Sequence, residues 1–275
     1  MSERQLIINA DDYGLANSVN SAIESLLSDG LISSVSVVAN GELFLEAAEF
    51  LRGGEWAVGA HLNVVEGTPL SSPDTVEALT DHRGRFVGAK ILAARWVRDS
   101  RWVERAVAAE WRAQLWHFSG HGLDLSHADS HQHIHAFPPF AKIFVRLCRD
   151  FGIRAVRVPF EKSAIGRRRL ASVGLNLCAD YSFRAHWNEF GIAHHFLGFR
   201  RAGRVNEASL LQDLTNLKPG LTEMVVHPSI IDGSPYSHFK GAEEYAALRS
   251  PSVRDRIREL GINTTDWRRL NSNGN

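Results

Sequence analysis

The chain has 275 residues, of which 44% are hydrophobic and 23% charged, and its 31 basic residues balance its 31 acidic ones. This composition is typical of one globular domain, and the zero net charge excludes the strong basic field that gathers nucleic acid or anionic membranes. With no apolar run of about 18 residues, no leader-like N-terminus and only two cysteines, we expect a cytoplasmic protein without stable membrane insertion.

Short apolar runs alternate with segments of helical periodicity along most of the chain. The predicted strands cover residues 5–10, 32–39, 56–63, the beginning of the histidine-rich segment 126–135, 153–159 and 221–228. The predicted helices cover residues 17–28, 43–51, 91–97, 102–120, 139–151, 209–217, 243–248 and 252–260. Asn17 or Ser18 is expected to cap the first helix. This alternation predicts one α/β domain over residues 1–275, with a parallel sheet that is either a barrel or doubly wound.

Two segments between these elements are expected to shape a pocket. Residues 64–90 are rich in Gly, Pro, Ser and Asp, which predicts a long loop over the functional site rather than a linker. Residues 160–204 are less regular. They include Arg167, Arg168 and Arg169, which we expect to form a solvated helix face.

Residues 126–135, SHADSHQHIH, hold four of the 13 histidines. The polar side chains occupy odd positions: His127, Asp129, His131, His133 and His135. In an extended strand they would share one face, and burying that face without a ligand would be costly. The pattern therefore indicates metal binding or acid–base chemistry, with a surface histidine tract as the alternative. Since a strand turns at its end, we expect His127, Asp129 and His131 to be the closest set, with the last two histidines beyond it.

Polar residues also end three other predicted strands. Asp11 and Asp12 follow the first strand, His61 lies near the end of the third, and His227 ends the last. Each alone is more often a turn, cap or structural hydrogen-bonding residue. Because parallel strands bring their C-terminal ends to one mouth of a barrel, we expect these residues to converge on one site.

These segments together resemble the YdjC-type carbohydrate deacetylases, which include chitooligosaccharide deacetylases and deacetylase-like proteins associated with hopanoid biosynthesis. The matching segments are NADDYGL at residues 9–15, GAHLN at 59–63, HADSHQHIH at 127–135, RAVRVP at 154–159 and VHP at 226–228. Tyr13 stands where the family usually has Phe. The stretches 221–223 and 245–251 look most similar to the hopanoid-associated branch.

The resemblance implies a distorted (β/α) barrel, similar to a TIM barrel, of the glycoside hydrolase and deacetylase type. It implies one divalent metal ion held by Asp12, His61 and His131; the ligand types suit Zn, whereas Mg ordinarily takes more oxygen ligands. Asp11 would be the general base, and His227 would protonate the departing amine. The residues expected to contact the substrate or to orient other groups are Asp129, His127, His133, His135 and Arg157.

The implied reaction removes the N-acetyl group from an N-acetylglucosamine-containing sugar, either an oligosaccharide or a glycolipid, and releases acetate. Two alternatives stay open: a metal-dependent phosphodiesterase or sugar isomerase on the same barrel, and a non-catalytic sugar-binding protein. The sequence has no Gly-rich phosphate cradle, and it keeps Asp11 and His227, which a binding protein would be expected to have lost. An N-acetylated amino sugar is therefore the expected partner, nucleic acid is not, and a homodimer is one assembly to consider.

Overall fold

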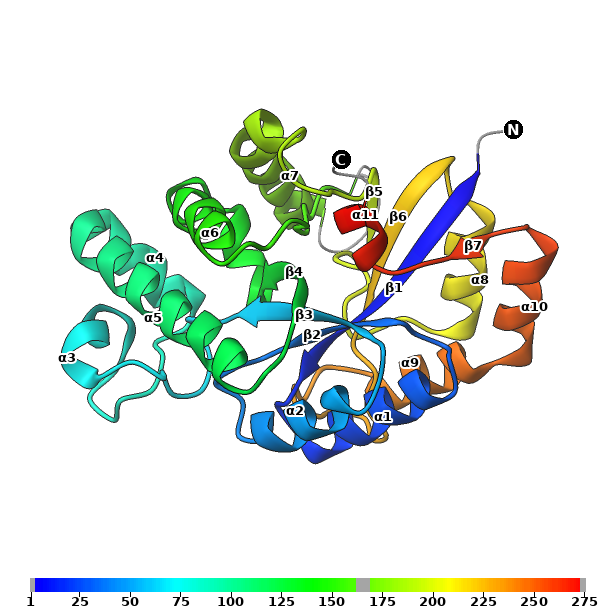
Figure 1. Ribbon diagram of the computed structural model, residues 1–275, viewed down its shortest axis with the longest axis horizontal. Coiled ribbons are helices and arrows are strands. Elements are labelled where there is room, and N and C mark those ends of the chain that lie inside the picture. The colour runs from blue at the N-terminus through cyan, green and yellow to red at the C-terminus, as the bar shows by residue number, and fades with distance from the viewer. Residues whose placement is uncertain (1–2, 162–168, 273–275) are drawn as a thin grey trace.

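The sheet is parallel, curled and surrounded by helices, as the computed structural model shows (Figure 1). The structure describes residues 3–161 and 169–272. The strands are β1 (Arg4–Tyr13), β2 (Ser34–Val37), β3 (Ala57–Leu62), β4 (Leu125–Ser130), β5 (His195–Leu197), β6 (Gly220–Val226) and β7 (Asn263–Thr264). Their order is β4-β3-β2-β1-β6-β5, with β7 paired to β1. The expected α/β, barrel-like fold is confirmed, in the form of a curled half-barrel with β4 and β5 at its edges.

Each predicted helix is present, with ends within two residues of those expected. The predicted helices correspond to α1 (Asn17–Ser28), α2 (Phe44–Arg52), α4 (Ala89–Arg98), α5 (Ser100–Gly120), α6 (Pro138–Asp150), α8 (Glu207–Thr215), α9 (Gly241–Arg249) and α10 (Pro251–Glu259). The additional helices are α3 (Pro73–Val76), α7 (Arg169–Phe183), α11 (Arg268–Ser272) and the 3₁₀ helices η1 (Glu77–Leu79), η2 (His131–Ala136) and η3 (Arg184–His186). The side chains at positions 167–169 lie outside the described residues. Among residues 3–161 and 169–272, no helix combines the length and apolar character needed to cross a membrane.

Helix α1 begins where expected, but the prediction that Asn17 or Ser18 caps it is wrong. Ala16 occupies the N-cap position, and no side chain caps the helix. Ser18 lies in the first turn, where its hydroxyl is hydrogen-bonded to the hydroxyl of Ser234 at 2.6 Å. The Ser18 side chain therefore links the helix to a distant loop and does not accept a hydrogen bond from the backbone N–H groups of the first turn.

The predicted strand over residues 153–159 is extended but makes only single bridges. Val156 pairs with Ala128 of β4, and Ala155 pairs with Gly191 on the other side. The segment thus lies between β4 and the chain that leads into β5, and it narrows the gap in the half-barrel. Pro159 has no N–H to donate, which prevents the ladder from continuing.

The histidine-rich segment is a strand for only half of its length. Strand β4 ends at Ser130, and η2 begins at His131. Gln132 and His133 have φ values of 54° and 55°, which turn the chain away from the strand direction. The common face predicted by alternation therefore applies to His127 and Asp129, and His131 directly follows them at the start of η2. His133 and His135 lie in or beyond the turn.

The interior of the curled sheet changes from apolar to polar along its strands. A buried apolar cluster fills the N-terminal end: Ile7, Ala57, Ala155, Ala193, Leu221 and Trp267. Because side chains on one face recur every second residue, the next positions along four of these segments are Asn9, Gly59, Arg157 and Glu223. Gly59 leaves room for the ring of His127, which a Cβ at that position would overlap. His127 in turn stacks on Trp267, with ring centroids 4.9 Å apart.

Buried polar side chains attach the segment 64–90 to helix α5. Glu110 accepts hydrogen bonds from the backbone N–H groups of Leu70 at 3.0 Å and Ser71 at 2.9 Å. Gln114 accepts from the N–H of Asn63 at 2.9 Å and donates to the carbonyl of the same residue. The beginning of this segment is therefore held at a defined position beside the C-terminal end of β3.

Candidate metal centre and active site

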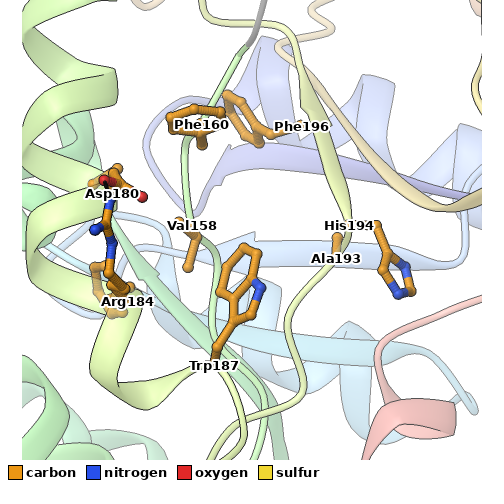
Figure 2. A pocket seen from close by; sticks show the side chains of 10 residues that line it. Val158, Phe160, Asp180, Arg184, Trp187, Ala193, His194 and Phe196 are labelled. Carbon is orange, nitrogen blue, oxygen red and sulfur yellow. Dashed lines mark hydrogen bonds and ion pairs between the residues drawn. The ribbon is translucent and has the colours of Figure 1, made fainter.

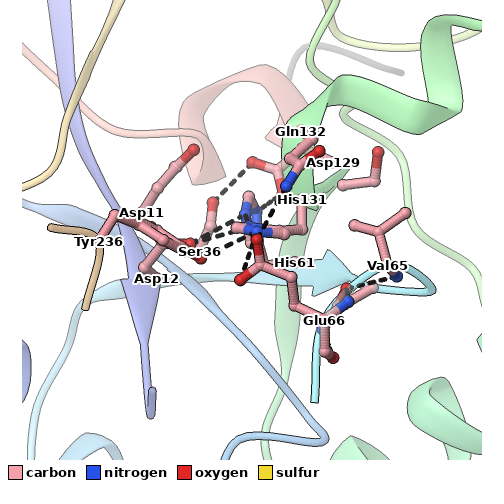
Figure 3. Close-up of polar contacts among 12 residues, drawn as sticks. Asp11, Asp12, Ser36, His61, Val65, Glu66, Asp129, His131, Gln132 and Tyr236 are labelled. Carbon is pink, nitrogen blue, oxygen red and sulfur yellow. Dashed lines mark hydrogen bonds and ion pairs between the residues drawn. The ribbon is translucent and has the colours of Figure 1, made fainter. Parts of the chain in front are cut away.

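Three strand ends each place one ligand atom within reach of a single ion (Figure 3). Oδ1 of Asp12 lies 3.0 Å from Nδ1 of His131 and 3.5 Å from Nε2 of His61, and these two ring nitrogens are 3.3 Å apart. Metal–ligand bonds of about 2.1 Å at angles of about 90–110° require separations of about 3.0–3.4 Å. The group therefore has the dimensions of a divalent metal site.

Asp12 has the burial and the free oxygens expected of a metal ligand. It is 2% exposed, and neither carboxylate oxygen has a hydrogen-bond partner among the described residues. Its φ of 69° is left-handed, and the register between β1 and β2 shifts between Ala10 and Tyr13. Such an irregularity redirects a side chain. The nearest side chains to its Oδ1 are the rings of His131 and His61. A buried carboxylate is costly unless a cation compensates it, so the residues present fit a divalent ion.

The ring of His61 is held by a carboxylate on its outer side. Its Nδ1 lies 2.5 Å from Oδ1 of Asp129. The other oxygen of Asp129 accepts from the hydroxyl of Ser36 at 2.7 Å and lies 2.7 Å from Nη1 of Arg157. A donor bond from Nδ1 to a carboxylate leaves Nε2 free for a metal. Asp129 therefore lies where it would orient His61 rather than bind an ion.

A second group of potential ligands, made of Asp11, His61 and Asp129, has similar dimensions. Its carboxylates are already compensated by Arg157, which donates to Oδ2 and Oδ1 of Asp11 at 2.8 Å each. The first group contains the unpartnered carboxylate, so it is the better candidate for a metal site.

Without a metal, protons supply the positive charge of the group. Burial acts to lower the pKa of His61, but the charges of Asp129 and Asp11 raise it to about 10. Burial likewise opposes a charge on His131, but Asp12 raises the pKa of that ring to about 9. Burial would raise the pKa of Asp12, yet the charge of His131 holds it well below its usual value. The two protonated rings therefore occupy the electrostatic role that a divalent cation would take.

Arg157 is fully buried and contacts three carboxylates from three elements. Besides Asp11 and Asp129, it donates through Nε to Glu223 at 2.8 Å. Burial raises the pKa of Glu223 to about 8, although Arg157 opposes the shift. Burial also disfavours a charge on Asp129, but Arg157 and His61 hold its pKa well below the usual range. The guanidinium thus joins Asp11 to the carboxylate that orients His61, and it has no exposed surface for direct contact with substrate.

His227 directly follows β6, which pairs with β1 so that Val226 lies opposite Ala10. Its backbone N–H donates to Glu244 at 2.9 Å, its ring edge packs on Phe239, and its Nδ1 is buried with no partner among the described side chains. Burial lowers the pKa of the ring, while the charges of Asp12 and Asp11 act in the opposite direction. The charges of both aspartates therefore act on the His227 ring.

The remaining histidines of the motif lie away from the metal group. His127 is fully buried below it, where burial lowers its pKa to about 3. The ring of His135 donates from Nε2 to the carbonyl of Arg157 at 3.0 Å and bonds Ser130 through Nδ1 at 2.6 Å. His133 is half-buried beside Phe196, and its Nδ1 has no described partner.

Two residues that contact His131 were not predicted from the sequence. The hydroxyl of Tyr236 lies 2.9 Å from Nε2 of His131, and Oε2 of Glu66 lies 3.5 Å from the same atom. Glu66 follows the end of β3 by a few residues, so the rule that polar residues gather at strand ends could have found it. Tyr236 lies in a loop after β6 without any repeating pattern.

Two cavities flank helix α7. One, of about 250 Å³, lies between α7 and the chain leading into β5, with Phe160, Phe196 and Trp187 on its walls (Figure 2). The other, of about 360 Å³, lies between α4 and α7 and begins at Gln132 and His133. Neither cavity is lined by a residue of the metal group. The second cavity is lined by Gln132 and His133, which follow His131 in the sequence.

A family model described as YdjC-like protein matches residues 5–259. A carbohydrate deacetylase of Vibrio vulnificus (strain CMCP6) is 30% identical over 273 residues, which cover 97% of this chain and 96% of that protein. A carbohydrate deacetylase of Brevibacillus brevis is 29% identical over 247 residues, 87% of this chain and 89% of the relative. A crystal structure from Enterococcus faecalis V583, described as a candidate cellobiose-phosphate cleavage protein, has a TM-score of 0.77 at 24% identity and covers 98% of this chain and 99% of its own, which indicates a shared fold.

Proposed function

Since the chain belongs to the YdjC-like protein family, we propose that it is a metal-dependent hydrolase that removes the N-acetyl group from an N-acetylglucosamine-containing sugar and releases acetate. The observation that carries the proposal is the buried group of Asp12, His61 and His131, with Asp11 beside it. The relatives that match most of the chain are named carbohydrate deacetylases, which supports the assignment.

Asp12, His61 and His131 would hold the metal ion. A bound divalent ion supplies Lewis-acid chemistry, since it acidifies water and polarises the amide carbonyl. Two imidazoles and one carboxylate with open positions suit Zn²⁺, while Mg²⁺ would need additional oxygen ligands from water. We therefore keep both ions in the assay and expect the donor set to favour zinc.

Asp11 would accept the proton of the attacking water. Its carboxylate is oriented on one side by the two donors of Arg157 and by the amide of Asn9, which donates to Oδ1 at 2.8 Å. A base held in one geometry needs no reorganisation when it acts. The same contacts keep Asp11 from moving into the position of a metal ligand.

His227 would give a proton to the departing amine, because an amide nitrogen leaves poorly as an anion. Burial lowers the pKa of this ring, so it enters the cycle largely neutral at neutral pH. It would act as an acid only after taking up a proton, and the proton that Asp11 accepts from water would supply it.

The test is acetate release from chitobiose, longer chitooligosaccharides and glycolipid analogues, with Zn²⁺ and Mg²⁺ supplied separately to metal-free protein. We expect acetate from at least one of these classes and none after prolonged chelation. Release of phosphate from phosphorylated sugars, or isomerisation without acetate, would favour the alternative enzymes. Sugar binding without turnover under either metal would favour a binding protein and overturn the proposal.

A further inference from the structure

His131 has an inner and an outer nitrogen, and both have defined surroundings. The inner Nδ1 faces Asp12 and His61. The outer Nε2 faces the Tyr236 hydroxyl at 2.9 Å and Oε2 of Glu66 at 3.5 Å. A neutral imidazole that gives Nδ1 to a metal carries its hydrogen on Nε2, so the outer nitrogen must be a donor.

The Tyr236 hydroxyl can accept that hydrogen bond because its own proton can be donated to the Glu66 carboxylate. The carboxylate of Glu66, whose Oε2 lies 3.5 Å from the same Nε2 atom, also interacts with this hydroxyl. A carboxylate only accepts, so the hydroxyl donates to Glu66 and its oxygen is left to receive the Nε2–H of His131. The result is a directed chain from His131 through Tyr236 to Glu66; Figure 3 labels these three residues in the close-up of the metal group.

The two loops that supply this chain are themselves fixed. Oε1 of Glu66 accepts from the amide of Gln132 at 2.9 Å, and the backbone N–H of Glu66 donates to Asn63 at 3.1 Å. The ring of Tyr236 packs edge-on against Phe239 with centroids 4.9 Å apart. Neither side chain has to be ordered anew when a metal binds, which favours a positioning role.

From this geometry we infer that Tyr236 and Glu66 are positioning residues that fix the orientation of His131 toward the metal, as Asp129 does for His61. The inference rests on the proposed metal-dependent function. The two supports differ in exposure, because Asp129 is fully buried whereas the Glu66 side chain is 34% exposed. The residues that contact Nε2 of His131 are therefore partly open to solvent at the mouth, whereas Asp129 is not.

The test compares Tyr236→Phe, Glu66→Gln and the double variant with the wild type. Matched controls are Tyr245→Phe, which loses a hydroxyl bonded to Ser25, and Glu104→Gln, whose carboxylate accepts from Trp96. Zn²⁺ affinity is measured by competition with a chelating indicator, and the thermal midpoint is measured on metal-free protein. We expect each single site variant to weaken Zn²⁺ binding about 10-fold or more. The fold-loss of Zn²⁺ affinity in the double variant should be smaller than the product of the two single fold-losses. The control variants should bind Zn²⁺ as tightly as the wild type.

Kinetics with saturating metal give the second measurement. A positioning role predicts a lower kcat with little change in KM, since the substrate does not need these groups for binding. The inference is overturned if the wild type binds Zn²⁺ and both single variants bind it equally tightly, and the proposed function then stands. It is also overturned if the variants lower the metal-free thermal midpoint without changing Zn²⁺ affinity. A wild type that binds no divalent metal would refute the proposed function itself.

Discussion

At the level of single residues, Asp11 and Asp12 show how neighbouring carboxylates receive different tasks. Asp11 is saturated by donors from Arg157 and Asn9, whereas the oxygens of Asp12 have no hydrogen-bond partner among the described residues. The left-handed conformation of Asp12 turns its side chain toward His131. A carboxylate that faces only the two histidine rings suits a cation, and one held by several donors keeps a fixed orientation toward an attacking water.

Replacing Asp11 with Asn should separate these tasks. The variant keeps the shape of the side chain but cannot accept a proton from water, so turnover should fall by about 10²-fold or more. Zn²⁺ content per chain, measured by elemental analysis, should stay at the wild-type value. Loss of metal together with activity would make Asp11 a ligand and would contradict its assignment as the base.

Replacing His227 with Ala should affect substrates according to their leaving groups. If this ring protonates the amine, N-acetyl sugar hydrolysis should slow strongly, while an activated acetate ester, whose leaving group needs no proton, should be much less affected. Both rates are measured on the metal-loaded variant. Equal losses on the two substrates would indicate a structural role for His227 and would remove it from the mechanism.

At the level of elements, the contact between β3 and β4 depends on the missing side chain of Gly59. A Cβ at this position would overlap the ring of His127, which is confined by Trp267. Gly59→Ala should therefore lower the free energy of unfolding by about 1–3 kcal/mol, as overpacked cores do.

Urea denaturation provides the measurement for Gly59→Ala, and Gly120→Ala is the control. Gly120 ends α5 and has nothing within 4 Å of an added Cβ, so its substitution should be neutral or slightly stabilising. If both variants unfold at the same urea concentration, the His127 ring can move to accommodate a Cβ at residue 59, and the prediction is wrong.

At the level of the whole molecule, metal binding and proton binding should compete. The pKa values of about 10 for His61 and about 9 for His131 mean that both rings are protonated near pH 7 in the metal-free protein. A metal must displace both protons, so its affinity should rise with pH by up to about 100-fold per unit below pH 9. Competition assays at pH 6, 7 and 8 measure the slope, and an affinity independent of pH would contradict it.

The same protons predict how the stability of the metal-free protein depends on pH. Both folded-state values lie above the usual histidine value of 6.5. The stabilisation is therefore complete below pH 6.5 and is lost as the pH rises through 9 to 10. Thermal unfolding from pH 6 to 10 should show this decline without metal. A metal at 100 times its Kd should add about 2.7 kcal/mol, so the loaded protein should lose less stability over this range.

The amino-acid sequence alone determined the order and type of most elements. Helical periodicity located the helices that cover the sheet, and apolar runs ending in polar residues located the strands. These patterns are local, and burial of one helix face or one strand is their physical cause, so they can be read without knowing the fold. The same rule indicated Asp11, Asp12, His61 and His227 as candidate site residues.

Tertiary structure decided which polar residues share the metal group and which lie elsewhere. Alternation treats His127 and His131 alike, but only His131, which directly follows the strand, reaches the metal group. His127 lies four residues earlier and is buried against Trp267. Tyr236 and Glu66 reach His131 from loops whose paths depend on long-range hydrogen bonds such as those of Glu110. No local periodicity encodes a contact between distant loops, because only packing against the rest of the chain fixes their ends.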